Sequence, residues 1–488
     1  MTTLGVLSRP RVDGSLSARK KLLTALCAVA IVALTVEATL TAALGGNKLL
    51  VIVPISVFVG LGMVALGLVN FENFVLTTIV LRASMDIVKP SSGNSGSAGV
   101  GTASASGLDP AGGLAVLFLL VAYFWFLSRK RAGVKSPPAS IHRVCLILFA
   151  AAGFLSVIDS ANLFVSLLEG IRVTAVAMML AVLEVLLVDR TAVKRLIGSV
   201  YVSSFVPVGL TVFNILTHHS QFSSGGFERY QGTFSQPNPF AIYLTMLIIM
   251  GVAIFPHLST RKRIGMSVLL LGSIVSLYYT YTRSAWIAAV IGVLAVAIMG
   301  RRRIVLGLMA ASLVVALVAV PTISQRFADL GSSTSATGYA SNSLSWRFSY
   351  WGDVLPLAAK DPVTGIGLKM SSFATDQQKE PHNDFLRAYV ETGIVGTVAY
   401  LTLLLSMILV ARHALRFSKR APKSYERSIA VGFGGCVIAF FLISIVSNVI
   451  TEVIVLWYYV AFAAAAYAVT QYRQNAILRG LPDPGDEA

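Results

Sequence analysis

The amino-acid sequence predicts an all-α protein that crosses a membrane many times. Hydrophobic residues make up 56% of the 488-residue chain and charged residues only 12%, and the mean hydropathy is +0.76. Apolar runs of about 17 to 25 residues recur along the chain, which is the length that a helix needs to cross a bilayer. Because a spanning segment must satisfy its backbone polar groups inside lipid, these runs indicate a helical bundle and exclude a soluble protein.

The apolar runs predict about fourteen transmembrane helices. The first run follows Arg19, Lys20 and Lys21 and lacks a small-residue cleavage site, so we interpret it as an uncleaved helix. A transmembrane domain over 22–470 would then separate an N-terminal tail at 1–21 from a C-terminal tail at 471–488. The expected spans are 22–44, 49–69, 71–88, 112–128, 144–158, 163–188, 196–217, 239–255, 264–281, 284–299, 304–321, 393–411, 428–449 and 453–470.

The basic residues predict the orientation of these helices. If the N-terminus is cytoplasmic, the clusters at 129–131, 190–195, 261–263, 301–303 and 412–423 all fall on the same side. The positive-inside rule therefore places both tails in the cytoplasm, in agreement with an even number of spans. Since topology accounts for most of the net charge of +17, that charge does not indicate binding to nucleic acid.

The longest polar segment, residues 322–392, is expected on the outer face. It is much longer than the usual connections of a compact bundle, and such loops tend to be lids or binding elements. Within it, 345–359 holds Trp346 and Trp351 in a mostly apolar run, which predicts an amphipathic helix on the membrane surface. A second short helix is expected at 384–391. The loop closes with His, Asn, Asp, Arg and Glu gathered between 382 and 391, which marks this region as the place for chemistry.

The residues that commonly bind metals are dispersed. Cys27, Cys145 and Cys436 each lie in an apolar run, so neither a disulfide framework nor a metal-ligand spacing is present. His218 and His219 are adjacent, but no third ligand lies near them. The sequence therefore predicts no metal site and no cofactor.

Three outward segments resemble motifs of one family. Residues 229–238, Arg-Tyr-Gln-Gly-Thr-Phe-Ser-Gln-Pro-Asn, resemble the R-x-x-G-x-F-x-x-P-N segment of the O-antigen ligase and polymerase family of integral membrane glycosyltransferases. Residues 282–285, Thr-Arg-Ser-Ala, look like the T-x-S-R-x-A turn of that family. The long loop and the helix after it are similar at Arg347, Trp351, Gly365, Gly367, His382, Leu386, Glu391, Gly393 and Gly396. The resemblance covers roughly residues 200 to 450, and the order and common side of the segments make it specific.

The resemblance implies a GT-C-like glycosyltransferase of the cytoplasmic (inner) membrane. Its donor would be a glycan on undecaprenyl or a similar polyprenyl diphosphate, and its acceptor a sugar hydroxyl of a glycan or glycolipid. Transfer would take place on the periplasmic or outer side of the bilayer, by inversion and without a metal. Ligase activity, as in lipopolysaccharide assembly, is favoured narrowly over polymerisation of a surface polysaccharide.

The candidate site residues can serve that reaction. Arg229 and Arg283 would bind the diphosphate, because guanidinium groups suit phosphate oxygens. His382, the only histidine of the long loop, would handle the proton of the acceptor. Asp384 and Glu391 are rival bases, and they could equally be acids of the first helical turn.

Secondary candidates surround these residues. Arg387 is expected to pair with Asp384 at i, i+3, or else to contact phosphate. Arg82 with Asp86, and Arg172 with Glu169, are expected as internal ion pairs or as substrate contacts. The other secondary candidates are Asn238, Arg347 and Asn383.

Two further functions remain open on the sequence. A flippase or transporter of lipid-linked oligosaccharides should carry charges near the membrane midplane, whereas the clustered polar groups of this chain lie on one face, which favours an enzyme. A polymerase of the shape, elongation, division and sporulation class would make Asp384 or Glu391 the decisive residue in place of His382.

Overall fold

The computed structural model describes residues 48–85, 110–134, 137–220, 222–224, 227–301, 343–420 and 424–478. These residues form α-helices, short 3-10 turns and one small hairpin, which confirms the all-α class. The expected spans at 22–44 and 304–321, the N-terminal tail and Asp86 lie outside the described residues.

The chain forms two compact units, 1–77 and 78–488. The first unit contains α2 (Lys48–Val69) and the start of α3 (Phe71–Arg82). Asn70 separates these helices, and its side-chain oxygen accepts a hydrogen bond from the Asn73 N–H at 3.0 Å. The 12-residue α3 is only about 18 Å long at 1.5 Å per residue. It is therefore shorter than the expected span at 71–88.

The second unit contains the other helices and the hairpin. Strands β1 (Phe222–Ser224) and β2 (Phe227–Arg229) pair antiparallel, with Phe222 opposite Arg229. The helices of this unit are α4 (Pro110–Arg131), α5 (Ile141–Leu155), α6 (Leu163–Leu186), α7 (Arg190–Ser203), α8 (Phe205–Leu216), α9 (Pro237–Ile254), α10 (Thr260–Tyr279), α11 (Arg283–Met299), α14 (Ser343–Val354), α15 (Asp384–Phe417), α16 (Tyr425–Ser444) and α17 (Val453–Leu478).

Within the described residues, eight helical segments are long and apolar enough to cross a membrane. They coincide with the spans expected from 112–128 to 239–255 and from 393–411 to 453–470, which supports a multi-pass membrane protein. The seventh expected span consists of two helices, α7 and α8, that meet at Ser204. This break precedes Pro207, which has no N–H to continue the helical hydrogen bonding.

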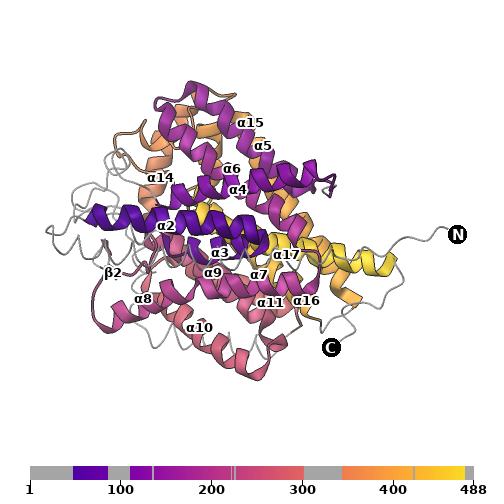
Figure 1. Ribbon diagram of the computed structural model, residues 1–488. Coiled ribbons are helices and arrows are strands. Elements are labelled where there is room, and N and C mark those ends of the chain that lie inside the picture. The colour runs from indigo at the N-terminus through magenta and orange to yellow at the C-terminus, as the bar shows by residue number, and fades with distance from the viewer. Residues whose placement is uncertain are drawn as a thin grey trace. The chain divides into compact units, whose positions relative to one another are not determined.

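The helices pack around α17 and α9, in which 94% and 83% of the residues in the apolar spanning stretch are buried. Helix α15 lies against α5 and α16, and α11 and α9 pack on α16 (Figure 1). The outward face of α10 carries Ile264, Val268 and Leu271, all exposed and spaced by three or four residues. An exposed apolar stripe of this kind fits a helix that faces lipid.

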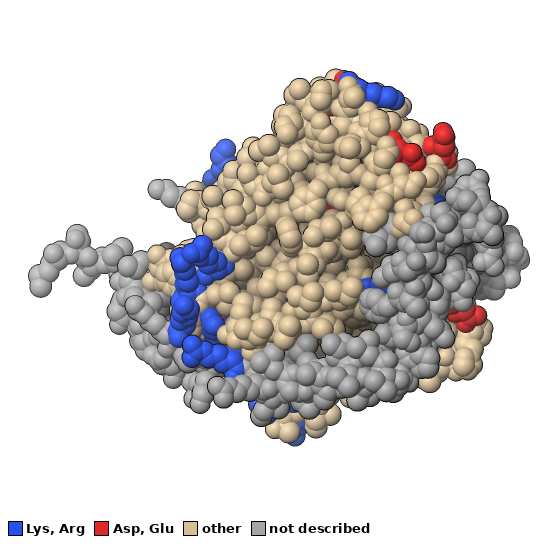
Figure 2. Space-filling view, turned by 180° about the vertical axis from the view of Figure 1, so that it is seen from behind, with Lys and Arg blue, Asp and Glu red and all other residues tan. Residues whose placement is uncertain are grey.

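The distribution of charge agrees with a membrane setting. In Figure 2, most of the visible described surface is uncharged, and the largest group of Lys and Arg side chains lies along the left edge, with a few others at the top and bottom. Helix α4 ends in Arg129, Lys130 and Arg131, and α10 begins with the basic run 261–263.

Helix α15 is two helices joined at Gly393, which has φ 61° and ψ −165°. The break exposes backbone groups that the preceding loop satisfies. Ile366 and Gly367 donate N–H groups to the carbonyls of Val390 and Glu391, at 3.0 and 3.1 Å. The Ile394 N–H in turn bonds to the Pro362 carbonyl at 3.0 Å. The expected short helix at 384–391 is therefore present and leads directly into the expected span.

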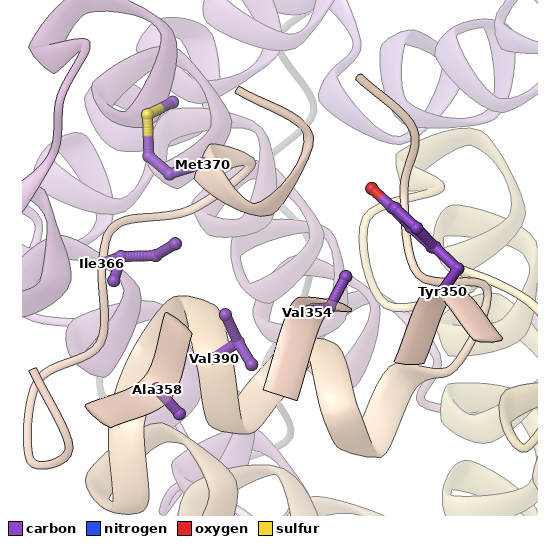
Figure 3. Close-up of a cluster of buried hydrophobic side chains, with 6 residues drawn as sticks. All are labelled: Tyr350, Val354, Ala358, Ile366, Met370 and Val390. Carbon is purple, nitrogen blue, oxygen red and sulfur yellow. The ribbon is translucent and has the colours of Figure 1, made fainter. Parts of the chain in front are cut away.

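A small hydrophobic core fixes the described part of the long loop to α15. Tyr350 and Val354 of α14 pack with Ile366 and Met370 of the loop and with Val390 of α15 (Figure 3). The helix expected at 345–359 is confirmed as α14 and a following 3-10 turn, Leu355–Ala359. Because Tyr350 and Val354 are fully buried, this face of α14 packs on protein.

We predict that Gly393→Ala destabilises the chain. A Cβ at this position would lie 2.2 Å from the Val363 carbonyl oxygen, and a residue with a Cβ loses about 1–2 kcal/mol in the left-handed region. Thermal unfolding of the purified chain in detergent should therefore show a lower midpoint. Gly352→Ala is the control, because nothing lies within 4 Å of the added methyl in that helical turn, where alanine is the better helix former. Equal midpoints for the two variants would contradict the prediction.

Candidate functional site

Arg229 ties together three segments that are distant in sequence. At the end of β2, its Nε donates to the Thr280 carbonyl at 2.7 Å, and its NH2 donates to Asn238 Oδ1 at 2.8 Å and to Thr282 Oγ1 at 3.0 Å. Asn238 belongs to the first turn of α9, while Thr280 and Thr282 form the turn between α10 and α11. Two of the sequence motifs thus meet at one guanidinium.

Arg283 is the next residue along this turn and begins α11. It lies close enough to Arg347 of α14 that its charge affects that side chain. Burial, and then repulsion from Arg283, lower the pKa of Arg347 to about 10. The Nε of Arg347 is buried without a hydrogen-bond partner among the described residues. The N-terminus of a helix also favours negative charge, so this corner of the structure is suited to an anion.

His382 lies beside the same positive charge. The imidazole is partly buried. This burial, followed by the charge of Arg347, lowers the pKa of His382 to about 4. The ring is therefore neutral at neutral pH. Its Nδ1 lies 3.1 Å from Nδ2 of Asn448 in the connection between α16 and α17, and the Trp346 ring approaches edge-on at a centroid distance of 5.8 Å.

The backbone of His382 is held in an unusual conformation, with φ 51°. Non-glycine residues in this region are strained and often occur at functional sites. The strain persists because α14 holds the segment before it. Trp351 Nε1 donates to the Pro381 carbonyl at 2.6 Å, Trp346 Nε1 donates to Gln377 Oε1 at 2.7 Å, and the Tyr350 hydroxyl donates to the Lys379 carbonyl.

Arg387 lies at the centre of a buried network at the start of α15, shortly after His382 in the sequence. Its Nε donates to Glu391 Oε2 at 3.0 Å, and its NH1 contacts Glu380 Oε2 at 2.9 Å and Thr451 Oγ1 at 2.6 Å. Glu391 also accepts the Lys369 N–H at 2.7 Å and the Ser371 hydroxyl at 2.6 Å. Both Glu391 oxygens are therefore engaged in holding the loop.

Asp384 contacts other partners. Its Oδ1 accepts the Ile450 N–H at 3.0 Å, and its Oδ2 accepts the Tyr400 hydroxyl at 3.2 Å. The expected pairing of Arg387 with Asp384 is therefore wrong, since the Asp384 carboxylate faces the connection between α16 and α17. Arg387 instead pairs with an acid four residues later on its own helix and with an acid of the loop.

One comparison bears on these residues. Residues 266–401 match the family described as O-antigen ligase. Residues 266–401 thus form an O-antigen ligase domain. No curated protein matches the chain.

The matched segment contains Arg283, Arg347, His382, and Arg387 with its two acids, Glu380 and Glu391. Arg229 and Asn448 lie outside it in the sequence, but both contact it directly, through Thr282 and His382. The site is therefore completed by residues before and after the matched segment, one at the end of β2 and one in the connection between α16 and α17.

The other expected residues have structural contacts. Asn383 caps α15 by accepting the Leu386 N–H at 3.0 Å. Arg172 and Glu169 form the expected ion pair on α6, at 2.9 Å. Arg82 is 6% exposed at the end of α3, and its expected partner Asp86 lies outside the described residues. Among the described residues, no group of three or more His, Cys, Asp or Glu could hold a metal ion.

Sequence reasoning missed Glu380, Asn448 and Thr451. Glu380 is an acid just ahead of the motif, and burial alone would raise its pKa, but Arg387, Lys369 and His382 together lower it. Asn448 falls inside the expected span at 428–449, and Thr451 lies in the short break before the next span. Polar residues at the end of an apolar run and in the break after it were the one signal that could have drawn attention to them.

We predict that Glu391→Ala destabilises the fold strongly. The change leaves Arg387 without one of its carboxylates and the Lys369 N–H and Ser371 hydroxyl without their acceptor. Breaking a buried ion pair costs about 3–5 kcal/mol, so the thermal midpoint in detergent should fall by several degrees. Asp376→Ala, at an exposed acid of the same loop, should leave the midpoint unchanged. A Glu391→Ala protein as stable as the wild type would refute the structural role.

Proposed function

We propose that the chain is a glycosyltransferase that moves a glycan from a polyprenyl diphosphate to an acceptor sugar hydroxyl, in the manner of an O-antigen ligase. The reaction would take place at the outer surface of the cytoplasmic membrane. The observation that carries this proposal is that Arg347 of α14 lies within electrostatic reach of both Arg283 and His382, which come from separate parts of the matched segment 266–401.

Arg283 and Arg347 would bind the diphosphate. Burial, and then repulsion from the neighbouring Arg283, lower the pKa of Arg347, and a diphosphate between the two guanidinium groups would relieve that repulsion. It would also neutralise the charge that develops on the leaving group. Arg229 would act differently, because its hydrogen bonds fix the turn that presents Arg283.

His382 would take the proton of the acceptor. The acceptor oxygen attacks the anomeric carbon, the bond from that carbon to the diphosphate oxygen breaks, and the diphosphate leaves with the electron pair. The acceptor proton passes to a ring nitrogen of His382. A ring that is neutral at neutral pH has the free lone pair that this step needs.

Asn448 would set which ring nitrogen is free. For Nε2 of His382 to accept a proton, Nδ1 must carry the other proton and donate it to an acceptor. Asn448 Oδ1 is buried without a hydrogen-bond partner among the described residues, and a rotation of the amide would bring it to Nδ1. The proposed reaction uses this orientation of the amide, which leaves Nε2 unprotonated.

The role of the Arg387 network would be support. Glu391 and Asp384 are each fully buried and hydrogen-bonded to backbone N–H groups, which leaves them poorly placed to receive a proton from an acceptor. This geometry favours His382 over the two carboxylates as the base.

We predict that purified protein transfers glycan from a polyprenyl diphosphate donor without nucleotide sugar. His382→Ala should lower the rate by about 10²–10⁴-fold, the usual contribution of a general base, and Arg283→Ala by about 10²–10³-fold. Lys360→Ala removes an exposed loop cation and serves as the control. Two assays distinguish a ligase from a polymerase. A ligase transfers the glycan only when a separate acceptor is added, whereas a polymerase extends its own donor glycan when the donor is offered alone. Full transfer by both active-site variants would overturn the proposal, and translocation of the lipid without any new glycosidic bond would indicate a flippase.

We also predict an unusual pH dependence. Because the pKa of His382 is about 4, the neutral ring persists as the pH falls through 6.5, and kcat/KM should decline only as the pH approaches about 4. Arg347→Gln removes a positive charge from beside the ring and should raise the pKa of His382, so the acid limb should move to higher pH. Lys360→Gln is the matched control. A wild-type limb near 6.5, or a limb that Arg347→Gln does not move, would contradict the electrostatic role of Arg347.

A further inference from the structure

A polar cavity lies at the opposite end of α15 from His382. It has a volume of about 360 Å³ and lies among the start of α5, the last turns of α15 and α17. Arg412 is 28 residues beyond Asp384 on α15, which corresponds to roughly 40 Å of helix. The cavity is therefore separate from the candidate active site.

Among the described residues, no acid pairs with the two arginines that line this cavity. Arg412 and Arg416 lie one helical turn apart, are both exposed and line the cavity. Neither makes an ion pair or a side-chain hydrogen bond with another described residue. Like charges four residues apart on a helix repel each other, so an anion between them would be favourable.

One acid that contacts lining residues of the cavity is already engaged. Glu184 of α6 contacts His142 Nε2 at 3.1 Å and Arg143 NH1 at 3.1 Å, and it also accepts the Ser140 hydroxyl. This carboxylate is nearly inaccessible to solvent and is already paired with Arg143, so it offers no counter-charge to the two arginines. Among the described residues, the lining of the cavity is therefore positive.

The position of the cavity indicates the kind of anion. Arg412 directly follows the apolar part of α15, and the cavity is also lined by Ile141 at the start of α5 and by Thr470 near the end of the apolar segment of α17. Ile141 and Leu409 give the cavity an apolar wall, while Arg412, Arg416 and Tyr467 supply polar groups. A wall that is apolar on one side and cationic on the other matches a lipid at the boundary between acyl chains and headgroups.

We propose that this cavity binds the phosphate headgroup of an anionic phospholipid from the surrounding bilayer. Arginine forks bind phosphate oxygens through two parallel hydrogen bonds, and basic pockets between transmembrane helices are suited to such headgroups. A volume of about 360 Å³ accommodates a headgroup and its glycerol, with the acyl chains along α5 and α15. The basic end of the bundle would thus hold a specific lipid as well as set the topology.

Lipid binding to the purified full-length chain tests this proposal. In titrations followed by native mass spectrometry, phosphatidylglycerol should bind about tenfold more tightly than zwitterionic phosphatidylcholine, a difference of about 1.4 kcal/mol. The double variant Arg412→Gln/Arg416→Gln should reduce that preference to less than about twofold. The control Lys130→Gln/Arg131→Gln removes the same charge from the end of α4, outside the cavity, and should keep the preference.

Three outcomes would overturn the proposal. Equal binding of the two lipids would show that charge is not recognised. An unchanged preference in the Arg412→Gln/Arg416→Gln protein, with its thermal midpoint in phosphatidylcholine intact, would place the lipid elsewhere. Displacement of phosphatidylglycerol by millimolar inorganic phosphate would indicate a site for a free anion in place of a lipid.

Discussion

The buried pair of Arg387 and Glu391 is the interaction on which the rest of the site depends. Glu391 binds Arg387, the Lys369 N–H and the Ser371 hydroxyl, while Arg387 reaches Glu380 and Thr451. One ion pair therefore joins the long loop, the start of α15 and the connection between α16 and α17. Such a pair contributes little net stability, since the desolvation of both ions offsets their attraction, but removing one partner is costly. The network thereby fixes one arrangement of the loop, and His382 and Asn448 are positioned by it.

This arrangement separates two kinds of polar group. The charge of Arg387 is paired with two acids of the protein, whereas the buried Arg347 lies beside a second cation, Arg283. Burial, and then the charge of Arg347, keep His382 neutral, since they lower its pKa to about 4. The proposed chemistry uses both features, because an anionic leaving group needs cations beside it and the acceptor needs a neutral base.

Much of the fold could be predicted from the sequence, because apolar length and charge patterning determine which segments cross a membrane. The helices at 343–354 and 384–392 also followed from local pattern. The partner of Arg387 did not, since acids at several spacings were available and the fold of the loop selected Glu380 and Glu391 over Asp384. Asn448 was missed because it lies 66 residues from His382, in a connection without a motif. The division of α7 from α8 and the shortness of α3 likewise depend on local backbone geometry. The length of an apolar run does not indicate this geometry.

The central claim is that Arg283 and Arg347 bind the diphosphate while His382 acts on the acceptor. The most direct test measures the affinity of the purified chain for undecaprenyl diphosphate without a glycan, so that no reaction can occur. The account predicts that Arg283→Ala/Arg347→Ala weakens binding by about tenfold or more, as expected when charge-assisted hydrogen bonds to phosphate are lost. His382→Ala should bind as tightly as the wild type. Unchanged affinity in the arginine double variant, or loss of binding in His382→Ala alone, would contradict this division of roles.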